Sequence, residues 1–188
     1  MSEPEAAGPV LFVCVGNRVR SPLAQGWWRQ RLRRSGLDAA HAHALADSAG
    51  THAWPGGEAP SAEAVFEAAR RGGDIADLRS RALEPHDFAR ARLVLAMDWD
   101  SLALAEAICP AEHRSRLRGL AEFQQRHRDP VIPDPADVGF DTLLARLDGG
   151  PVERLPAVLL QIVLPGALLF AFQLWLDDWW FGLPHVLY

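Results

Sequence analysis

The sequence predicts an α/β protein with three α/β/α layers around a central parallel four-stranded sheet, plus an extra hydrophobic C-terminal segment. Short apolar, β-branched runs typical of buried parallel strands alternate along the chain with longer helical patterns. The chain has 188 residues, 49% of them hydrophobic and 23% charged, which is enough apolar material for one domain with a packed core. We expect this domain over residues 1–150 and a hydrophobic, Trp-rich extension over residues 151–188.

Four segments have the character of strands. The first is the uninterrupted apolar run at residues 9–15, which ends at a Gly-Asn turn signal. A second strand is expected just before residues 47–51, and the apolar run at residues 93–97 predicts a third. A further short strand is expected at residues 119–123. Because helical segments separate these strands, we expect them to run parallel.

The first predicted helix directly follows the first strand. Ser21 is a favourable N-cap and Pro22 a favourable first helical residue, so we expect a helix from Pro22 to about Arg34, ended by Gly36. Its expected inward-facing side chains are Leu23, Trp27 and Leu32. Further helices are predicted at residues 61–71, 98–108 and 140–147, and the dense prolines of residues 129–135 predict an irregular loop.

Charge and composition exclude several classes of function. The net charge of −5 and the pI of about 5.8 argue against a nucleic-acid-binding surface. All the basic residues are arginine, a usage typical of GC-rich bacterial genomes. Two cysteines exclude a disulfide scaffold and a four-cysteine zinc site, and the seven histidines show no metal-ligand spacing, so no metal is expected. The acidic N-terminus lacks the basic region of a secretory signal, which favours a cytoplasmic location.

Residues 14–21 carry the clearest chemical signal, because they place a cysteine at a strand end, a short loop, and an arginine at a helix N-terminus. We expect the loop to bind phosphate through Val15, Gly16, Asn17, Arg18, Val19, Arg20 and Ser21, assisted by the helix dipole. Arg20 can bind two phosphate oxygens through its planar guanidinium, and the positive surroundings favour the nucleophilic thiolate of Cys14. Ser21 can donate a hydrogen bond to that sulfur. The pattern therefore predicts a nucleophile beneath a bound phosphate.

At these residues the sequence resembles the low-molecular-weight protein tyrosine phosphatases. The family's signature reads roughly V-C-x-G-N-x-C-R-S-P, and residues 13–22 match it except at Val19. The resemblance continues at residues 47–51, 95–98 and 132–135, and it covers about residues 9–150 in the right order. It implies a phosphomonoester hydrolase, by family a protein tyrosine phosphatase, that acts through a phosphocysteine intermediate without any cofactor.

Asp134 is the expected general acid. Such a mechanism needs a proton for the leaving oxygen and a base for the water that cleaves the phosphocysteine. Asp134 lies between two prolines that would hold its carboxylate in place, and the resemblance implies the same role for the aspartate of this Asp-Pro loop. Asp129, which also precedes a proline, is the less favoured candidate because Gly139 and Phe140 follow Asp134 at the family's spacing.

Some departures from the family's pattern affect the residues expected to contact the substrate and not those expected to carry out the reaction. The aromatic pair that often follows the Asp-Pro is replaced by Ala136 and Asp137, which leaves Trp54 as the expected aromatic wall of the substrate site. Arg18 stands where an apolar residue is frequent, so it either adds positive charge at the entrance or extends into water. The expected substrate wall therefore consists of Trp54, Arg18 and Ala136.

Two further departures concern the loop itself. Val19 replaces the second cysteine of the signature, so Cys14 has no neighbouring disulfide partner, and only Cys109 remains as another thiol. Leu78 stands where the family often has a histidine that supports the loop asparagine. We expect Asn17 to be positioned by Ser48 or by backbone groups instead.

The C-terminal segment is compatible with two kinds of contact. Leu155–Leu176 carries no charge and is long enough to span a bilayer, but its prolines would kink a helix. These are contact with a membrane and dimerisation through the segment. We therefore expect a cytoplasmic location, either with or without membrane association.

Two alternative functions also remain open. The expected partner is a phosphotyrosine protein or a small phosphomonoester. The alternatives to a phosphatase are a non-catalytic phosphate- or phosphopeptide-binding module and an arsenate reductase, which would need further cysteines to relay a disulfide.

Overall fold

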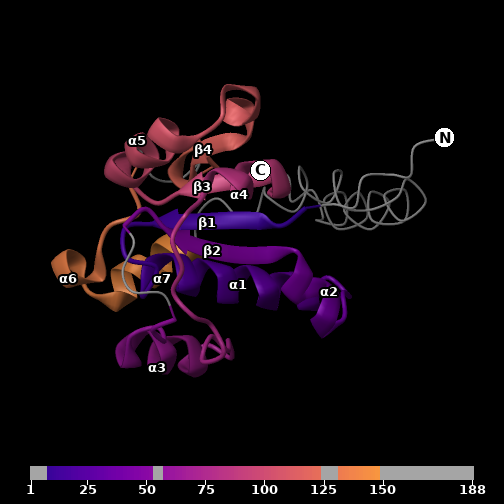
Figure 1. The fold of residues 1–188 in the computed structure, drawn as a ribbon. Coiled ribbons are helices and arrows are strands. Elements are labelled where there is room, and N and C mark those ends of the chain that lie inside the picture. Colours follow the sequence, from indigo (N-terminus) through magenta and orange to yellow (C-terminus); the bar gives the residue numbers. More distant parts are fainter. Residues whose placement is uncertain (1–7, 53–56, 124–130, 149–188) are drawn as a thin grey trace, which may run out of the picture. The chain divides into compact units, whose positions relative to one another are not determined.

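The computed structural model describes residues 8–52, 57–123 and 131–148. It confirms the predicted class, a four-stranded, all-parallel sheet covered by helices (Figure 1). The strands are β1 Val10–Cys14, β2 Ala46–Gly50, β3 Leu93–Ala96 and β4 Leu117–Gly119, in the order β2-β1-β3-β4. The central strand β1 places Val13 beside Ala49 of β2 and Ala96 of β3. Parallel pairing brings the carboxyl ends of the strands to one edge of the sheet, where the site lies.

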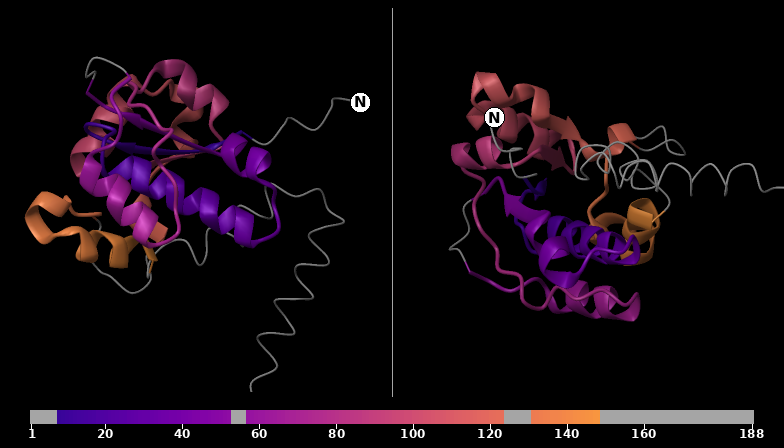
Figure 2. Two further views of the ribbon diagram at one scale, coloured as in Figure 1. Left: turned by 90° about the horizontal axis from the view of Figure 1, so that it is seen from below. Right: turned by 90° about the vertical axis from the view of Figure 1, so that its right-hand side faces the viewer.

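Helices form the two outer layers. They are α1 Arg20–Arg34, α2 Ala39–Ala44, α3 Ala62–Arg70, α4 Pro85–Arg90, α5 Trp99–Ile108, α6 Pro135–Val138 and α7 Phe140–Asp148, with 3-10 turns η1 Ala111–Arg116 and η2 Leu120–Phe123. Helix α1 lies over β1 and β2, with α3 and α7 beside it, whereas α4 and α5 cover the opposite face (Figures 1 and 2). This is the expected three-layer arrangement.

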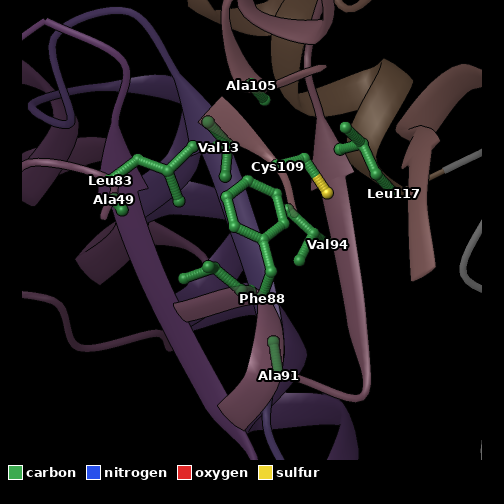
Figure 3. Packing of buried hydrophobic residues seen from close by; sticks show 10 residues of the cluster. Val13, Ala49, Leu83, Phe88, Ala91, Val94, Ala105, Cys109 and Leu117 are labelled. Atoms are coloured by element: carbon green, nitrogen blue, oxygen red, sulfur yellow. The ribbon is translucent and has the colours of Figure 1, made fainter. Parts of the chain in front are cut away.

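The face of the sheet under α4 and α5 holds a compact apolar cluster. Figure 3 shows Phe88 of α4 at its centre, among side chains of β1, β3 and α5. The buried members are Leu11, Val13, Ala49, Leu83, Phe88, Ala91, Val94, Ala105, Cys109 and Leu117. Because Phe88 is fully buried, its truncation to alanine would cost about 3–5 kcal/mol. The cluster fixes α5, and with it the residues at the N-terminal end of that helix.

The opposite face of the sheet is buried under α1. Side chains alternate along a strand, so Phe12 faces away from the cluster that contains Leu11 and Val13, and it is also buried. Leu23 and Leu32 of α1 are buried as predicted, but Trp28 and not Trp27 is the buried tryptophan. Trp27 stacks on Trp28 with ring centroids 6.5 Å apart and lies under the guanidinium of Arg31.

Several predicted boundaries were wrong. The strand expected before residues 47–51 is β2 itself, and the preceding residues form α2, where the Asp38 carboxylate caps the helix by accepting from the His41 N–H. The last strand ends at Gly119, and residues 120–123 form η2, because Leu117 supplies the buried side chain of that strand. Helix α4, with a capping box between Glu84 and Asp87, was not predicted.

The C-terminal predictions remain untested. The boundary expected between residues 150 and 151 and the apolar run Leu155–Leu176 lie outside the described residues. Within the described ranges, no helix is long and apolar enough to cross a membrane.

Candidate active site

Several carbonyl groups at the loop after β1 are hydrogen-bonded to neighbouring segments of the chain. The carbonyl oxygens of Cys14, Val15, Arg18 and Val19 accept hydrogen bonds of 2.9–3.1 Å from the N–H groups of Thr51, His52, Ser61 and Leu23. Among the residues that the structure describes, none accepts a hydrogen bond from the backbone N–H groups of residues 15–21. These successive free donors, which we call the cup, lie next to the positive end of α1 and are suited to bind the oxygens of an anion such as phosphate.

The loop backbone is held in an unusual conformation. Asn17 has φ 50°, the only positive φ of a non-glycine residue in the described part of the chain. The end of β2 approaches this loop so closely that a Cβ at Gly50 would lie 2.7 Å from the Val15 carbonyl oxygen. Glycine is therefore required at this position of β2, and the loop is enclosed on that side.

The side chain of Asn17 stabilises this conformation. Its Oδ1 accepts from the backbone N–H of Arg81 at 2.9 Å, which fixes the orientation of the amide because a backbone N–H can only donate. Its Nδ2 donates to the hydroxyls of Ser21 and Ser48, both at 2.9 Å, and Ser48 donates onward to Gln25. Ser48 and a backbone group thus position Asn17, as the sequence suggested.

The hydroxyl of Ser21 also lies within hydrogen-bond distance of the Cys14 sulfur. The two atoms, Ser21 Oγ and Cys14 Sγ, lie 3.0 Å apart, while Ser21 Oγ accepts from Asn17 and has the Ala49 carbonyl at 3.4 Å as a further acceptor. A thiolate can only accept a hydrogen bond, so the Ser21 hydroxyl donates when the Cys14 sulfur is ionised. Ser21 is therefore a donor to the sulfur and not the predicted N-cap. Helix α1 begins at Arg20, with Val19 at the N-cap position.

Arg20 links two carboxylates at the rim of the cup. Its guanidinium Nη1 donates to Asp98 and, at 3.3 Å, to the carbonyl of Ile132, and its Nη2 lies 3.4 Å from Asp134 Oδ2. The side chain of Arg20 is 9% exposed, so its planar group is held in one orientation. The structure thus brings the predicted cation and the predicted acid together at the end of the strand that carries Cys14.

Asp98 is the functional residue that sequence reasoning missed. Burial raises the pKa of Asp98, but hydrogen bonds from Ser101 and the hydrogen bond and charge of Arg20 outweigh burial and hold this pKa below its usual value. Its carboxylate therefore remains an anionic anchor for Arg20. The signal was present in the sequence, because an aspartate that ends β3 must lie at the same sheet edge as Cys14.

Asp134 is positioned by the start of α6. Its Oδ1 accepts from the N–H of Ala136 at 3.0 Å, and Asp134 is the N-cap of this short helix. The carboxylate is 45% exposed, so a substrate can reach it. Asp129, the alternative acid, lies outside the described residues.

The predicted substrate wall is only partly described. Arg18 forms an ion pair of 2.8 Å with Glu58, and its Nε donates to the carbonyl of Ala59 at 3.4 Å. Its charge is therefore compensated at the entrance and does not extend freely into water. Ala136 is exposed but presents only a methyl group, and Trp54 lies outside the described residues.

Arg81 connects the loop to an ion-pair network. While its N–H holds Asn17, its guanidinium contacts Asp87 at 2.9 Å and Asp47 at 2.8 Å, and Arg90 contacts Asp47 at 2.6 Å. Burial lowers the pKa of Arg81, but the hydrogen bonds and charges of Asp87 and Asp47 outweigh it and raise this pKa. The network keeps the segment that supports Asn17 in place.

Cys109 is a free thiol of the apolar core. It is the C-cap residue of α5 and belongs to the cluster under α4 and α5, and the structure has both Cys109 and Cys14 as free cysteines. Burial also raises the pKa of the Cys109 thiol. Cys109 is therefore a core residue and no disulfide partner for Cys14.

A buried thiol beneath a phosphate-binding cup, on an all-parallel α/β sheet, is the arrangement of the cysteine-dependent phosphatases. The family model described as "Low molecular weight phosphotyrosine protein phosphatase" matches residues 9–149, so the chain belongs to this family.

Known relatives agree with this assignment. A low molecular weight protein-tyrosine-phosphatase of Streptomyces coelicolor is 33% identical over 162 residues, which cover 81% of this chain and 94% of the relative. Low molecular weight phosphotyrosine protein phosphatase 2 of Drosophila melanogaster is 31% identical over 140 residues, 74% of this chain and 83% of the relative.

Solved structures share the fold. A low molecular weight phosphotyrosine phosphatase of Vibrio cholerae aligns with a TM-score of 0.67 at 27% identity, covering 82% of this chain and 99% of that chain. YfkJ of Bacillus subtilis aligns with a TM-score of 0.73 at 24% identity, covering 85% of this chain and 98% of that chain.

Proposed function

We propose that this protein hydrolyses phosphotyrosine in proteins through a phosphocysteine intermediate. The observation that carries the proposal is the cup of free N–H donors at residues 15–21 with the Cys14 sulfur at its base. Family membership and the names of the relatives support phosphotyrosine as the substrate group.

In the first step the Cys14 thiolate attacks phosphorus and forms an S–P bond while the bond from phosphorus to the tyrosine oxygen breaks. The N–H groups of the cup and Arg20 stabilise the equatorial oxygens, where charge builds up in the transition state. Asp134, in its protonated form, gives its proton to the departing oxygen, and tyrosine leaves as the neutral phenol.

In the second step water attacks the phosphocysteine. The Asp134 carboxylate takes a proton from the water, a new P–O bond forms, and the S–P bond breaks with its electron pair returning to sulfur. The Ser21 hydroxyl, 3.0 Å from that sulfur, donates to the departing thiolate. The products are inorganic phosphate and the restored Cys14 thiolate, so the chain's own groups complete the cycle.

The experiment compares wild type, Cys14→Ser and Asp134→Asn on phenyl phosphate and p-nitrophenyl phosphate. Cys14→Ser should abolish turnover of both. Asp134→Asn should lower kcat about 10²- to 10⁴-fold on phenyl phosphate and much less on p-nitrophenyl phosphate, because nitrophenolate leaves without a proton. Asp137→Asn, an exposed aspartate in the same helix α6, is the matched control and should leave both rates unchanged.

The same assays separate the two alternatives. A binding module would capture a phosphotyrosine peptide in wild-type form without releasing phosphate, and this result would refute the proposal. An arsenate reductase would show arsenate-dependent thiol oxidation. The burial of Cys109 in the core argues against an arsenate reductase, because it is the only other thiol of the sequence that could relay a disulfide.

A further inference from the structure

The two residues that follow the Asp134-Pro135 pair carry no aromatic ring. A phenyl ring that projects from the cup needs an apolar surface beside it, yet Ala136 and Asp137 contribute no ring. We infer that Trp99, the first residue of α5, forms this surface and packs against the aromatic ring of the substrate. This inference rests on the proposed function and names the residue that makes the site select aryl phosphates.

Trp99 is placed beside the cup by its neighbour in the chain. It follows Asp98, and Asp98 shares the Arg20 guanidinium with Asp134. The residues directly after these two carboxylates, Trp99 and Pro135, each begin a helix on a segment that is attached to the same guanidinium. Met97 and Ile132 hold the two segments together, since the Ile132 N–H donates to the Met97 carbonyl at 2.7 Å. Trp99 thus begins α5 at the edge of the sheet to which the Asp134 segment is bound.

The direction of the Trp99 side chain follows from its position in the helix. A Cα–Cβ bond in an α-helix is tilted toward the helix N-terminus. The N-terminus of α5 lies at the carboxyl edge of the sheet, next to Arg20. The indole of Trp99 therefore leans toward the edge that holds the site and away from the core cluster under α5.

Trp99 is both exposed and held by a rigid backbone. Its side chain is 59% exposed, which leaves a large apolar surface in water that a substrate ring can cover. The capping box fixes its main chain, because the Asp98 carboxylate accepts from the Ser101 N–H at 2.7 Å and the Asp98 N–H donates to the Ser101 hydroxyl at 3.1 Å. A preorganised indole loses little freedom when the substrate binds.

The test is the KM and kcat of Trp99→Ala on a phosphotyrosine peptide, together with the inhibition constant of inorganic phosphate, which fills the cup but carries no ring. We expect KM to rise about tenfold, kcat to stay within about twofold and the phosphate inhibition constant to remain unchanged. Trp99→Phe should restore most of the affinity. Ile108→Ala removes another exposed apolar side chain, that of a residue 40% exposed at the far end of the same helix, and should change nothing.

The possible results of this test distinguish a failure of the inference about Trp99 from a failure of the proposed function. An unchanged KM in Trp99→Ala, with wild-type turnover intact, would overturn the inference and leave the phosphatase function standing. An equal loss of peptide and phosphate affinity would also overturn it, because it would show that Trp99 acts only through Asp98 and Arg20. Failure of the wild type to hydrolyse any aryl phosphate would instead refute the proposed function.

Discussion

The carboxylates of Asp98 and Asp134 contact the two terminal nitrogens of one guanidinium, that of Arg20. Asp98 is less exposed (16%) than Asp134 (45%), so the two have different roles. Asp98 is a fixed anchor that sets the plane of the guanidinium, whereas Asp134 stays accessible to substrate. When a phosphate enters the cup, Arg20 can bind it without losing the contact with Asp98.

Asp98→Asn should lower kcat/KM without unfolding the protein. Asparagine is as good an N-cap as aspartate, so α5 keeps its first turn, but the charged hydrogen bond to Arg20 is lost. We expect kcat/KM for p-nitrophenyl phosphate to fall about 10- to 100-fold. Thermal unfolding should change little.

The matched control for Asp98→Asn is Asp100→Asn, which removes an exposed acid from the same helical turn. If both variants keep wild-type kcat/KM, Asp98 does not position Arg20.

Ser21→Ala should slow the second chemical step more than the first. Without the Ser21 hydroxyl, the Cys14 thiolate leaves phosphorus without a hydrogen-bond donor at 3.0 Å. We expect kcat to fall about 10- to 100-fold and the phosphocysteine to accumulate. Rapid mixing with p-nitrophenyl phosphate should then show a burst of nitrophenol close to one equivalent of enzyme.

Ser61→Ala is the control for the burst experiment. Ser61 also lies beside the loop, but its hydroxyl caps α3 by accepting from the Ala64 N–H. Equal kinetics of Ser21→Ala and wild type would show that the sulfur needs no donor.

Glu58→Gln should change the preference for charged substrates. Arg18 and Glu58 form an ion pair at the entrance, with side chains 45% and 43% exposed. Removing the carboxylate leaves the Arg18 charge uncompensated, so the KM for a phosphopeptide with acidic flanking residues should fall about two- to fivefold. The KM for p-nitrophenyl phosphate should stay within twofold, as it should in Arg18→Ala. An identical KM ratio for acidic and neutral peptides in all three proteins would contradict a role of this pair in selectivity.

The sequence was sufficient for the parallel four-stranded class of the sheet, because local patterns and the family signature specify it, and two of the residues that it singled out, Arg20 and Asp134, lie 3.4 Å apart. It was insufficient where a tertiary contact decides the local structure. Ser21 looks like an N-cap in the sequence, but in the structure its hydroxyl accepts from the Asn17 amide and lies 3.0 Å from the Cys14 sulfur. Asp98 looks like an ordinary helix cap until Arg20 is placed beside it.

Asp87→Asn should lower the free energy of unfolding at neutral pH and should lower it less in acid. The Asp87 carboxylate is fully buried and accepts from Arg81 at 2.9 Å and from the Glu84 N–H at 3.0 Å. Burial raises the pKa of Asp87, but these hydrogen bonds and the Arg81 charge outweigh burial and hold it below its ordinary value of 3.8. The ionised carboxylate therefore contributes stability at pH values above the unfolded pKa, and this contribution is lost as the pH falls through the lower folded pKa.

Urea unfolding of wild type and Asp87→Asn at pH 7, 5 and 3 measures this contribution. We expect the variant to be about 2–3 kcal/mol less stable at pH 7 and 5, because the hydrogen bonds from Arg81 and Glu84 lose their charged acceptor. The difference in stability should narrow at pH 3, because Asp87 of the unfolded chain takes up a proton as the pH falls below the ordinary value of 3.8. Asp77→Asn removes a 53% exposed carboxylate that lies 3.4 Å from Arg29 and should cost under about 0.5 kcal/mol at every pH. The difference in unfolding free energy between wild type and Asp87→Asn could instead stay constant from pH 7 to pH 3. That result would show that packing, and not the charge of Asp87, holds the Arg81 segment.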